Sequence, residues 1–97
     1  MHTVIDVEIS YDPTKNEHNI AQRGLSFERA TEFDFETALF AVGARHDYGE
    51  IRHRALGWLD SRLHALVFVE TAKGIRVISF RKANQREVKR YEEATQP

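Results

Sequence analysis

The residues of this chain with the clearest chemical potential are cations, most of them near the C-terminus. The set consists of Arg52, Arg54, Arg76, Arg81, Lys82 and Arg86. Guanidinium groups pair with two phosphate oxygens at once, so such a set suits a ligand that carries phosphate. The alternative is ordinary surface charge that forms ion pairs with acidic residues elsewhere. Taken without other information, the cations favour that alternative.

Several side chains could supply acid–base chemistry beside these cations. The general-base candidates are Glu50, Glu70 and Glu87. Tyr91 could orient a phosphate or donate a hydrogen bond to it, but a tyrosine one turn after Glu87 equally fits a helix anchor in the core. His46 and His53 are further candidates because histidine titrates near neutrality, although solvated or hydrogen-bonded histidines are commoner.

The sequence offers little support for metal or thiol chemistry. The chain has five histidines and no cysteine. None of the histidines has the tight spacing of a metal-ligand pair, and without cysteine there is no thiolate ligand, thiol nucleophile or disulfide. The glycines show neither phosphate-loop nor dinucleotide spacing. We therefore expect no metal and no other cofactor.

Charge is distributed unevenly along the 97 residues. Residues 1–40 hold three basic and eight acidic side chains, a net charge of −5, whereas residues 73–97 hold seven basic and three acidic, a net charge of +4. Such asymmetry is consistent with two surfaces that have different partners, with a polyanion at the C-terminal end, but charge alone favours the alternative of a solvated, charged terminal helix. The overall net charge of −1 does not by itself point to nucleic acid.

Length and composition favour one globular domain over residues 1–97. Hydrophobic residues are 41% and charged residues 30% of the chain, which is typical of a folded protein with a modest core. No apolar run approaches the roughly 20 residues needed to span a bilayer. The N-terminus also lacks a basic region followed by an apolar stretch, so we expect no signal peptide and a cytoplasmic location.

Periodicity and capping signals predict the elements of the N-terminal half. Alternating apolar residues predict a strand over 4–10. Asp12-Pro13 and Gly24 predict a helix over 13–23, with a carboxylate cap at its start and a glycine at its end. Ser26 begins a second helix, which we expect to bury Phe27 and Ala30.

The C-terminal half reads as a meander of strands followed by a helix. Strands are predicted over 35–42, 52–59, 63–70 and 75–80, with a loop over 43–50 and tight turns at Asp60-Ser61 and Lys73-Gly74. Asn84 caps a final helix that turns Val88 and Tyr91 inward. The order predicts an α+β fold: a small antiparallel sheet with two N-terminal helices and one C-terminal helix against one face.

Strand parity decides which cations can act together. Arg52 and Arg54 are two residues apart, so a regular strand places them on one face. Arg76 and Arg81 are five apart and have opposite parity. They can therefore reach one site only if the strand ends or bulges near Phe80.

Matches scattered along the chain fit one known family. They are Tyr11, Asp12, Pro13, Lys15, Asn19, Gly24, Ser26, Phe27, Ala30, Asp47, Glu50, Arg52, Ala55, Leu56, Gly57, residues 75–79, Arg81, Ala83, Glu87 and Tyr91. In this order and at matching spacing, from about Ile9 to Glu92, the chain resembles BrnT-type toxins of bacterial type II toxin–antitoxin systems. Two departures are Tyr11, where the family usually has tryptophan, and Gln22-Arg23, where it commonly has Lys-His.

The resemblance implies a fold, an activity and a partner. The fold would be RelE-like, a small ribonuclease sheet flanked by helices. The activity would be RNA cleavage that inhibits translation. The partner would be a cognate antitoxin that carries a DNA-binding domain, neutralises the toxin in a hetero-oligomer and represses the shared operon with it.

The mechanism expected from this resemblance is metal-independent. The ribose 2′-OH attacks the adjacent phosphorus and expels the 5′-oxygen, while cations stabilise charge on the phosphate. We assign Arg52, Arg76 and Arg81 to the phosphate, Glu50 to the base and Tyr91 to orientation. The expected RNA-binding residues are Lys82, Arg86, Lys15 and Tyr48, with Tyr48 or Tyr11 as a stacking surface.

Two rival functions remain open at this stage. The chain could be a non-catalytic protein-binding module or an inactive relative that docks a partner through its basic C-terminal end. Direct sequence-specific DNA binding is less favoured, because no helix-turn-helix pattern is present and the net charge is slightly negative. Expression separates the ribonuclease toxin from the binding module: the toxin arrests growth when it is made alone, whereas the module does not.

Overall fold

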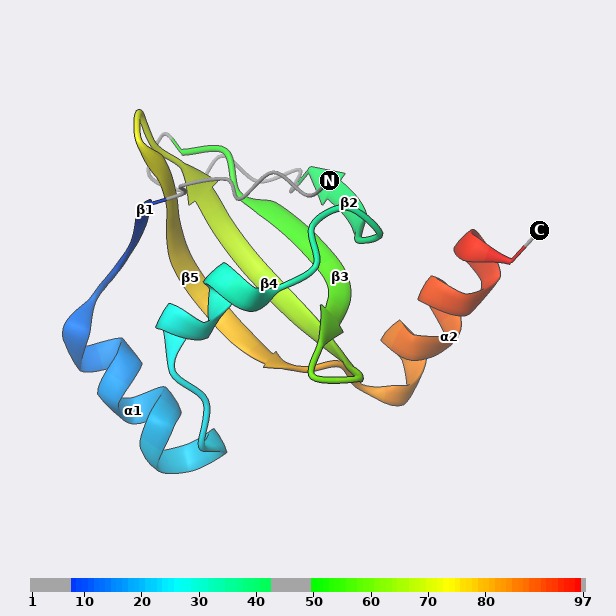
Figure 1. The fold of residues 1–97 in the computed structure, drawn as a ribbon, viewed down its shortest axis with the longest axis horizontal. Helices are drawn as coiled ribbons and strands as arrows, with labels where there is room; N and C mark the ends of the chain where they lie inside the picture. Colours follow the sequence, from blue (N-terminus) through cyan, green and yellow to red (C-terminus); the bar gives the residue numbers. More distant parts are fainter. Residues whose placement is uncertain (1–7, 43–49, 97) are drawn as a thin grey trace.

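The computed structural model describes residues 8–42 and 50–96 of the chain. Its elements are β1 (Glu8–Tyr11), α1 (Pro13–Arg23), the 3₁₀-helix η1 (Phe27–Glu32), β2 (Leu39–Val42), β3 (His53–Leu59), β4 (Arg62–Glu70), β5 (Gly74–Lys82) and α2 (Gln85–Thr95). The five strands form one sheet in the order β1-β5-β4-β3-β2 (Figure 1). The α+β class is therefore confirmed.

Capping decides where the two α-helices begin. The Asp12 carboxylate accepts hydrogen bonds from the backbone N–H groups of Thr14 and Lys15, and Gly24 ends α1 with a φ of 66°. At α2, the Asn84 side chain accepts from the Glu87 backbone N–H, while the Glu87 carboxylate accepts from that of Asn84. Both helices were predicted from these residues, and both predictions are confirmed.

The segment after η1 departs from the prediction. A strand was expected over 35–42, but β2 begins only at Leu39. The reason is Asp34, whose carboxylate accepts from the backbone N–H groups of Glu36 and Thr37 and from the Thr37 hydroxyl. This local bonding offers the backbone an alternative to the sheet and keeps 34–37 in a turn.

The sheet is antiparallel only in part. β2, β3, β4 and β5 form the predicted meander, but β1 pairs in parallel with β5, so the fully antiparallel prediction is wrong at this edge. The chain leaves β1 through α1 and η1 and reaches β5 only after three other strands, so no hairpin links the two partners.

The second N-terminal helix is a six-residue 3₁₀-helix. Residues 4–7 of the predicted first strand and 43–49 of the predicted loop lie outside the described part.

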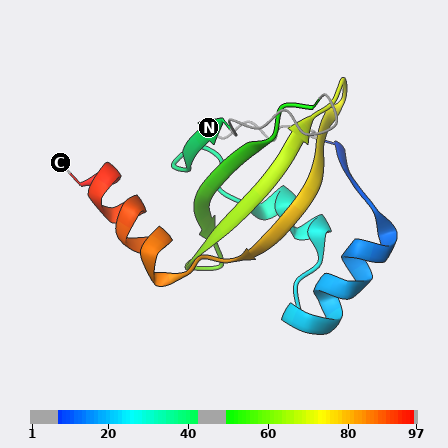
Figure 2. The same cartoon turned by 180° about the vertical axis from the view of Figure 1, so that it is seen from behind.

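Two hydrophobic clusters cover opposite faces of the sheet. The first joins Leu25 and residues of η1 to Leu66, Val77 and Phe80, whereas the second joins Tyr91 of α2 to Leu56 and Ala65. Neighbouring residues of β4 thus belong to different clusters, as alternation requires. η1 crosses in front of the sheet in Figure 1 and lies behind it in Figure 2, whereas Tyr91 of α2 packs on the other face. The prediction that every helix packs on one face is therefore wrong.

In the described part of the chain, no helix is long and apolar enough to cross a membrane.

Candidate functional site

A β-bulge in β5 determines where its cations point. Val67 of β4 pairs with Ser79, but the next residue, Phe68, pairs with Val77, so Ile78 is an extra residue on β5. One extra residue reverses the alternation of side chains beyond it. Val77 and Phe80 consequently both face the first cluster.

The same bulge places Arg76 and Arg81 on the other face of the sheet. Arg76 pairs with Val69 and Arg81 with Ala65, and those two residues of β4 are four apart and share a face. The irregularity that the sequence required near Phe80 is therefore present, two residues before it. We call this surface the α2 face, because Tyr91 of α2 packs on it.

A cavity of about 240 Å³ lies on the α2 face between the sheet and α2. Its lining residues are Leu39, Ala41, Arg54, Ala55, Leu56, Ala65, Leu66, Val67, Arg81, Glu87 and Arg90. Most of the lining is apolar, and every charged residue in it except Glu87 is an arginine. An apolar floor with a cationic rim suits a ligand that has both a flat apolar part and a negative group.

Arg81 and Glu87 form a two-pronged ion pair inside this cavity. Arg81 Nη1 donates to Glu87 Oε1 at 2.7 Å, and Nη2 donates to Oε2 at 2.9 Å. This bonding, more than the Asn84 backbone N–H and the charge of Arg90, holds the pKa of Glu87 at about 2 and raises that of Arg81. Glu87 is therefore ionised at neutral pH and a poor proton acceptor, while Arg81 is fixed in direction.

Arg54 and Arg90 complete the rim from two other elements. Arg54 pairs with Val67 across β3 and β4, and Arg90 lies on α2 three residues after Glu87. Both are exposed, and neither forms an ion pair with any residue of 8–42 or 50–96. The sequence included Arg54 among the phosphate-binding cations but not among the site residues, and it missed Arg90. The helical spacing of Glu87, Arg90 and Tyr91 was the available signal.

Arg76 and Glu50 bind one another away from this cavity. Arg76 Nη2 donates to Glu50 Oε1, and both side chains are partly exposed, at 39% and 29%. The pairing of Arg76 with Val69 and of Arg81 with Ala65 separates the two arginines by about 13 Å along the sheet. The structure brings them to one face without bringing them to one phosphate.

Tyr91 is held inside the protein. It is 7% exposed, its hydroxyl donates to the Thr37 carbonyl at 2.9 Å, and it accepts from Trp58 Nε1 at 3.1 Å. The Trp58 and Tyr91 rings pack edge to face at 5.8 Å. Both functions of the hydroxyl are thus used within the protein, which favours the helix-anchor interpretation that the sequence had left open.

The remaining predicted site residues are dispersed. Lys82 pairs with His64 and points away from Arg81, because the two are consecutive on β5. Arg86 is exposed in the first turn of α2, and Lys15 is exposed on α1. Arg52 is half-buried just before β3. Tyr48 and His46 lie outside the described residues. Within residues 8–42 and 50–96, no three carboxylate or imidazole side chains are grouped as metal ligands.

Comparison with known families identifies the family of this chain. The family model described as the ribonuclease toxin BrnT of type II toxin–antitoxin systems matches residues 11–87. The chain belongs to the BrnT family. Its family therefore implies an RNA target and an antitoxin partner. No curated protein matches the chain.

The region matched to the BrnT family contains most of the cavity. It begins at Tyr11, the last residue of β1, and ends at Glu87, the partner of Arg81. Arg54 and Arg81 lie inside the match, whereas Arg90 and Tyr91 lie beyond it. The α2-face cavity is thus built mainly from the part of the chain that carries the BrnT relationship.

Proposed function

We propose that this chain is an endoribonuclease toxin, with a RelE-like fold, that cleaves RNA by attack of the ribose 2′-OH and thereby inhibits translation. The observation that carries the proposal is the convergence of Arg54, Arg81 and Arg90 on one cavity of a BrnT-family chain. RNA supplies its own nucleophile, so the protein needs only to align the hydroxyl, stabilise the phosphate and move protons.

Charge stabilisation is the role we assign to the three arginines. Arg54 and Arg90, which pair with no carboxylate in the described residues, contact the phosphate oxygens directly. Arg81 contacts them through the N–H groups that Glu87 leaves available, and Glu87 fixes its orientation. Cations that are already oriented beside an apolar floor need little reorganisation as charge develops, and such electrostatic stabilisation usually accounts for most of the rate enhancement.

Glu50, which the sequence suggested as the base, lies out of reach of a phosphate held at the cavity, because Arg76 and Arg81 lie about 13 Å apart along the sheet. Its carboxylate binds Arg76 at the same face of the sheet. The alternative carboxylate, Glu87, is a poor base because Arg81 holds its pKa at about 2. Neither carboxylate is therefore assigned as the base, and Glu50→Gln is expected to lower kcat less than Arg81→Gln does.

The partner we propose is an antitoxin that carries a DNA-binding domain and neutralises the toxin in a hetero-oligomer in the cytoplasm. The family supports a partner of the antitoxin class. The arginine rim of the cavity is the surface that a neutralising partner would cover with acidic side chains, because it is the surface that must be kept from RNA.

The decisive experiment is an RNA-degradation assay in the presence of EDTA. Wild type is compared with Arg54→Gln, Arg81→Gln and Arg90→Gln, and with Lys73→Gln as a charge-matched control in the exposed β4–β5 turn. We expect cleavage in EDTA by wild type and control, and a loss of at least about tenfold for each rim variant. Wild-type cleavage by all three rim variants would contradict the site. Loss of all activity in EDTA would contradict the metal-independent mechanism.

A non-catalytic partner-binding module is the second candidate. The observation that favours it is that Arg76 and Arg81, two of the predicted phosphate ligands, are each already bound by a carboxylate of the chain. Expression without a partner separates the two functions. A toxin arrests growth and is rescued by its antitoxin, whereas a module leaves growth unchanged and still binds that antitoxin.

A further inference from the structure

A second, larger cavity lies on the opposite face of the sheet. It has a volume of about 610 Å³ and lies between the C-terminus of α1 and the turn that joins β3 to β4. Its lining residues are Gln22, Arg23, Gly24, Leu25, Arg29, Leu59, Asp60, Arg62, His64 and Lys82. It shares no residue with the α2-face cavity. We call it the α1-face cavity.

A buried histidine gives this cavity a hydrogen-bond acceptor. His64 is 5% exposed, and its Nδ1 lies 2.8 Å from the Arg62 carbonyl oxygen. Because a carbonyl oxygen only accepts, Nδ1 carries the proton and the lone pair resides on Nε2. Nε2 has no hydrogen-bond partner among the described residues, and it is not fully enclosed by protein atoms. His64 lines the cavity, so Nε2 is the ring nitrogen whose lone pair is available to a ligand there.

The ring is neutral at physiological pH. Burial lowers the pKa of His64, and the nearby charges of Lys82 and Arg62 lower it further, against the opposing effects of the Arg62 carbonyl and Asp60. A neutral imidazole with a protonated Nδ1 accepts a hydrogen bond at Nε2. A ligand that pairs with that nitrogen must therefore offer a hydroxyl or an N–H group.

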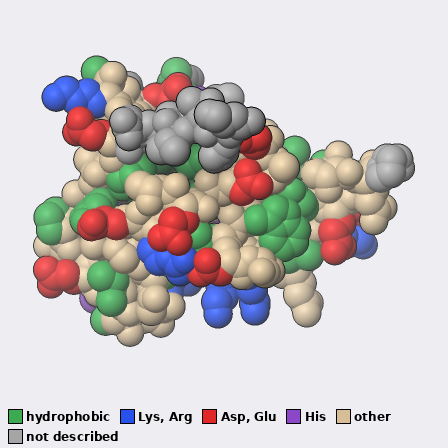
Figure 3. Space-filling model, viewed as in Figure 1, with side chains coloured by type: hydrophobic (Ala, Val, Ile, Leu, Met, Phe, Trp, Pro, Cys, Tyr) green, Lys and Arg blue, Asp and Glu red, His purple; other side chains and the backbone are tan. Residues whose placement is uncertain are grey.

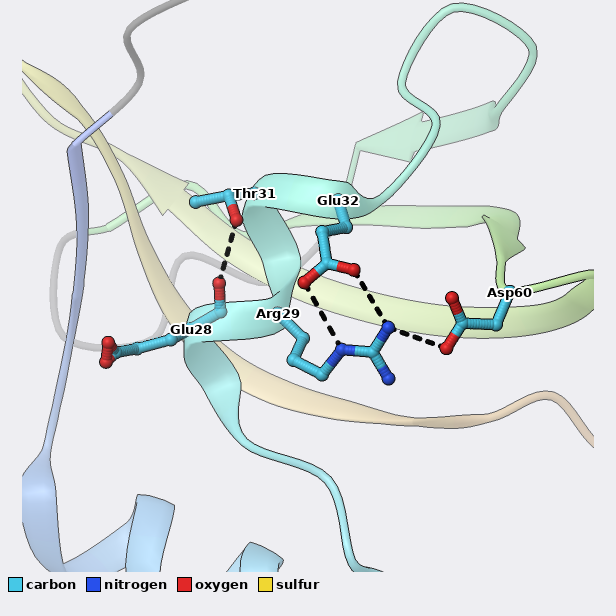
Figure 4. A network of polar contacts seen from close by, with 5 residues as sticks. All are labelled: Glu28, Arg29, Thr31, Glu32 and Asp60. Atoms are coloured by element: carbon cyan, nitrogen blue, oxygen red, sulfur yellow. Dashed lines mark hydrogen bonds and ion pairs between the residues drawn. The ribbon is translucent and has the colours of Figure 1, made fainter.

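The cations of the cavity differ in whether an acidic residue of the protein already neutralises them. Arg29 donates to Glu32 at 2.9 Å and to Asp60 at 2.6 Å, which ties η1 to the β3–β4 turn (Figure 4). Its charge is thus largely balanced. Arg23, Arg62 and Lys82 form no ion pair with any described residue, so the cavity has an uncompensated positive charge. Figure 3 shows Lys and Arg side chains gathered at the lower edge of the molecule, near this turn and the start of α2.

The chemistry of the cavity therefore combines two requirements. Its cations select an anion, and guanidinium groups suit phosphate oxygens in particular. Its neutral histidine selects a hydroxyl or N–H donor beside that anion. A ribonucleotide carries both groups, because its ribose hydroxyls lie next to its phosphate, and the 2′-OH is the group that distinguishes RNA from DNA.

We propose that the α1-face cavity binds one ribonucleotide of an RNA strand, with Arg23, Arg62 and Lys82 at its phosphate and His64 Nε2 accepting from its ribose 2′-OH. The inference rests on the proposed function, since it adds a second RNA contact to that enzyme. Arg81 and Lys82 are consecutive residues that point to opposite faces, so an RNA strand that rounds the end of β5 reaches both cavities. His64 is a positioning and specificity residue in this arrangement.

The first test measures nucleotide binding and does not depend on cleavage. Adenosine 3′-monophosphate is titrated into the full chain while the His64 ring signals are followed by NMR, with 2′-deoxyadenosine 3′-monophosphate and inorganic phosphate as comparison ligands. We expect the ring signals to shift and the ribonucleotide to bind at least about tenfold more tightly than either comparison ligand. Unmoved ring signals, or equal binding of all three ligands, would overturn the proposal.

Variants then assign the contacts within that titration. Arg62→Gln and Lys82→Gln are each expected to weaken ribonucleotide binding about tenfold, while Lys73→Gln leaves it unchanged. His64→Phe, which keeps a ring beside Phe80, should remove the preference for ribose over deoxyribose. His64→Gln serves the same purpose if the phenylalanine variant does not fold. A retained ribose preference in either folded variant contradicts the role of His64.

The second test separates this inference from the proposed function. In RNA-cleavage kinetics, Arg62→Gln and Lys82→Gln should raise KM with kcat retained, whereas Arg54→Gln lowers kcat. A fall in kcat with unchanged KM for Lys82→Gln would overturn the second subsite. If the chain cleaves no RNA, the proposed function fails, and the nucleotide titration still decides whether the cavity binds a ribonucleotide.

Discussion

Arg76 and Arg81 lie on the same face of the sheet although their positions in β5 have opposite parity. The extra residue Ile78 reverses the alternation between them, so that Arg76 pairs with Val69 and Arg81 with Ala65. The bulge also keeps Val77 and Phe80 together in the core. One irregularity in the ladder thus keeps Val77 and Phe80 on one face and both arginines on the other.

The distance between these two arginines leads to the first prediction. Because Arg76 lies about 13 Å from Arg81 along the sheet and is bound to Glu50, Arg76→Gln should affect RNA binding more than the chemical step. We expect a higher KM with kcat reduced less than in Arg81→Gln, measured with a defined RNA substrate. An equal loss of kcat in both variants would mean that the two side chains contact one phosphate.

The Arg81–Glu87 pair predicts an acid-dependent loss of stability. The pKa of Glu87 is lowered to about 2, so its ionised form stabilises the folded state. That stabilisation is complete above the ordinary pKa of a glutamate and is lost as pH falls toward about 2. Denaturant unfolding at a series of pH values should show a smaller loss in this range for Glu87→Gln than for wild type. Glu92→Gln, an exposed change on the same helix, should behave like wild type.

The contacts of Tyr91 predict how α2 is anchored. Tyr91→Phe leaves the Thr37 carbonyl and Trp58 Nε1 without their partner. We expect the free energy of unfolding to fall by about 1–3 kcal/mol. In a double-mutant cycle with Trp58→Phe, the two losses should be less than additive, because they share one hydrogen bond. Full additivity would show that the bond contributes nothing.

At Gly57, β3 packs so closely against the segment around Phe33 and Ala38 that a larger side chain would clash. A Cβ at this position would lie 2.5 Å from Phe33 Cζ and 3.1 Å from Ala38 Cβ. Gly57→Ala should therefore destabilise the protein by about 1–3 kcal/mol in thermal or denaturant unfolding. Phe33→Leu should relieve the contact, so Gly57→Ala should destabilise the Phe33→Leu variant less than it destabilises the wild type. An equal loss in both backgrounds would place the strain elsewhere.

The lowered pKa of His64 predicts a second effect of pH on stability, closer to neutral pH. Its pKa is lowered mainly by burial, and Lys82, Arg62 and Asp60 are the charged groups that act on it. The folded state therefore binds this proton less readily than the unfolded state, and stability falls as pH decreases from about 7 to about 5. His64→Gln should flatten the pH dependence of unfolding in that range. An unchanged slope would show that the ring takes up its proton without cost.

Local signals predicted the helices of this fold but not the pairing of its first strand. Asp12, Gly24 and Asn84 act on neighbouring backbone groups, so their effects were visible in the sequence. The parallel pairing of β1 with β5 joins residues more than sixty positions apart, and no local pattern encodes it. The predicted β2 was too long because the prediction rested on hydrophobicity and did not include the hydrogen bonds that the Asp34 carboxylate accepts.

The sequence by itself determined the family, the capped helices, the meander and the excess of cations at the C-terminal end, because each of these depends on residue type and spacing along the chain. Only the tertiary structure decided which cations act together. It placed Arg54, Arg81 and Arg90 around one cavity and Lys82 with His64 in another. The physical reason is that the direction of a side chain depends on strand register, a bulge at Ile78 and the packing of α2, and all three are set by contacts between distant segments.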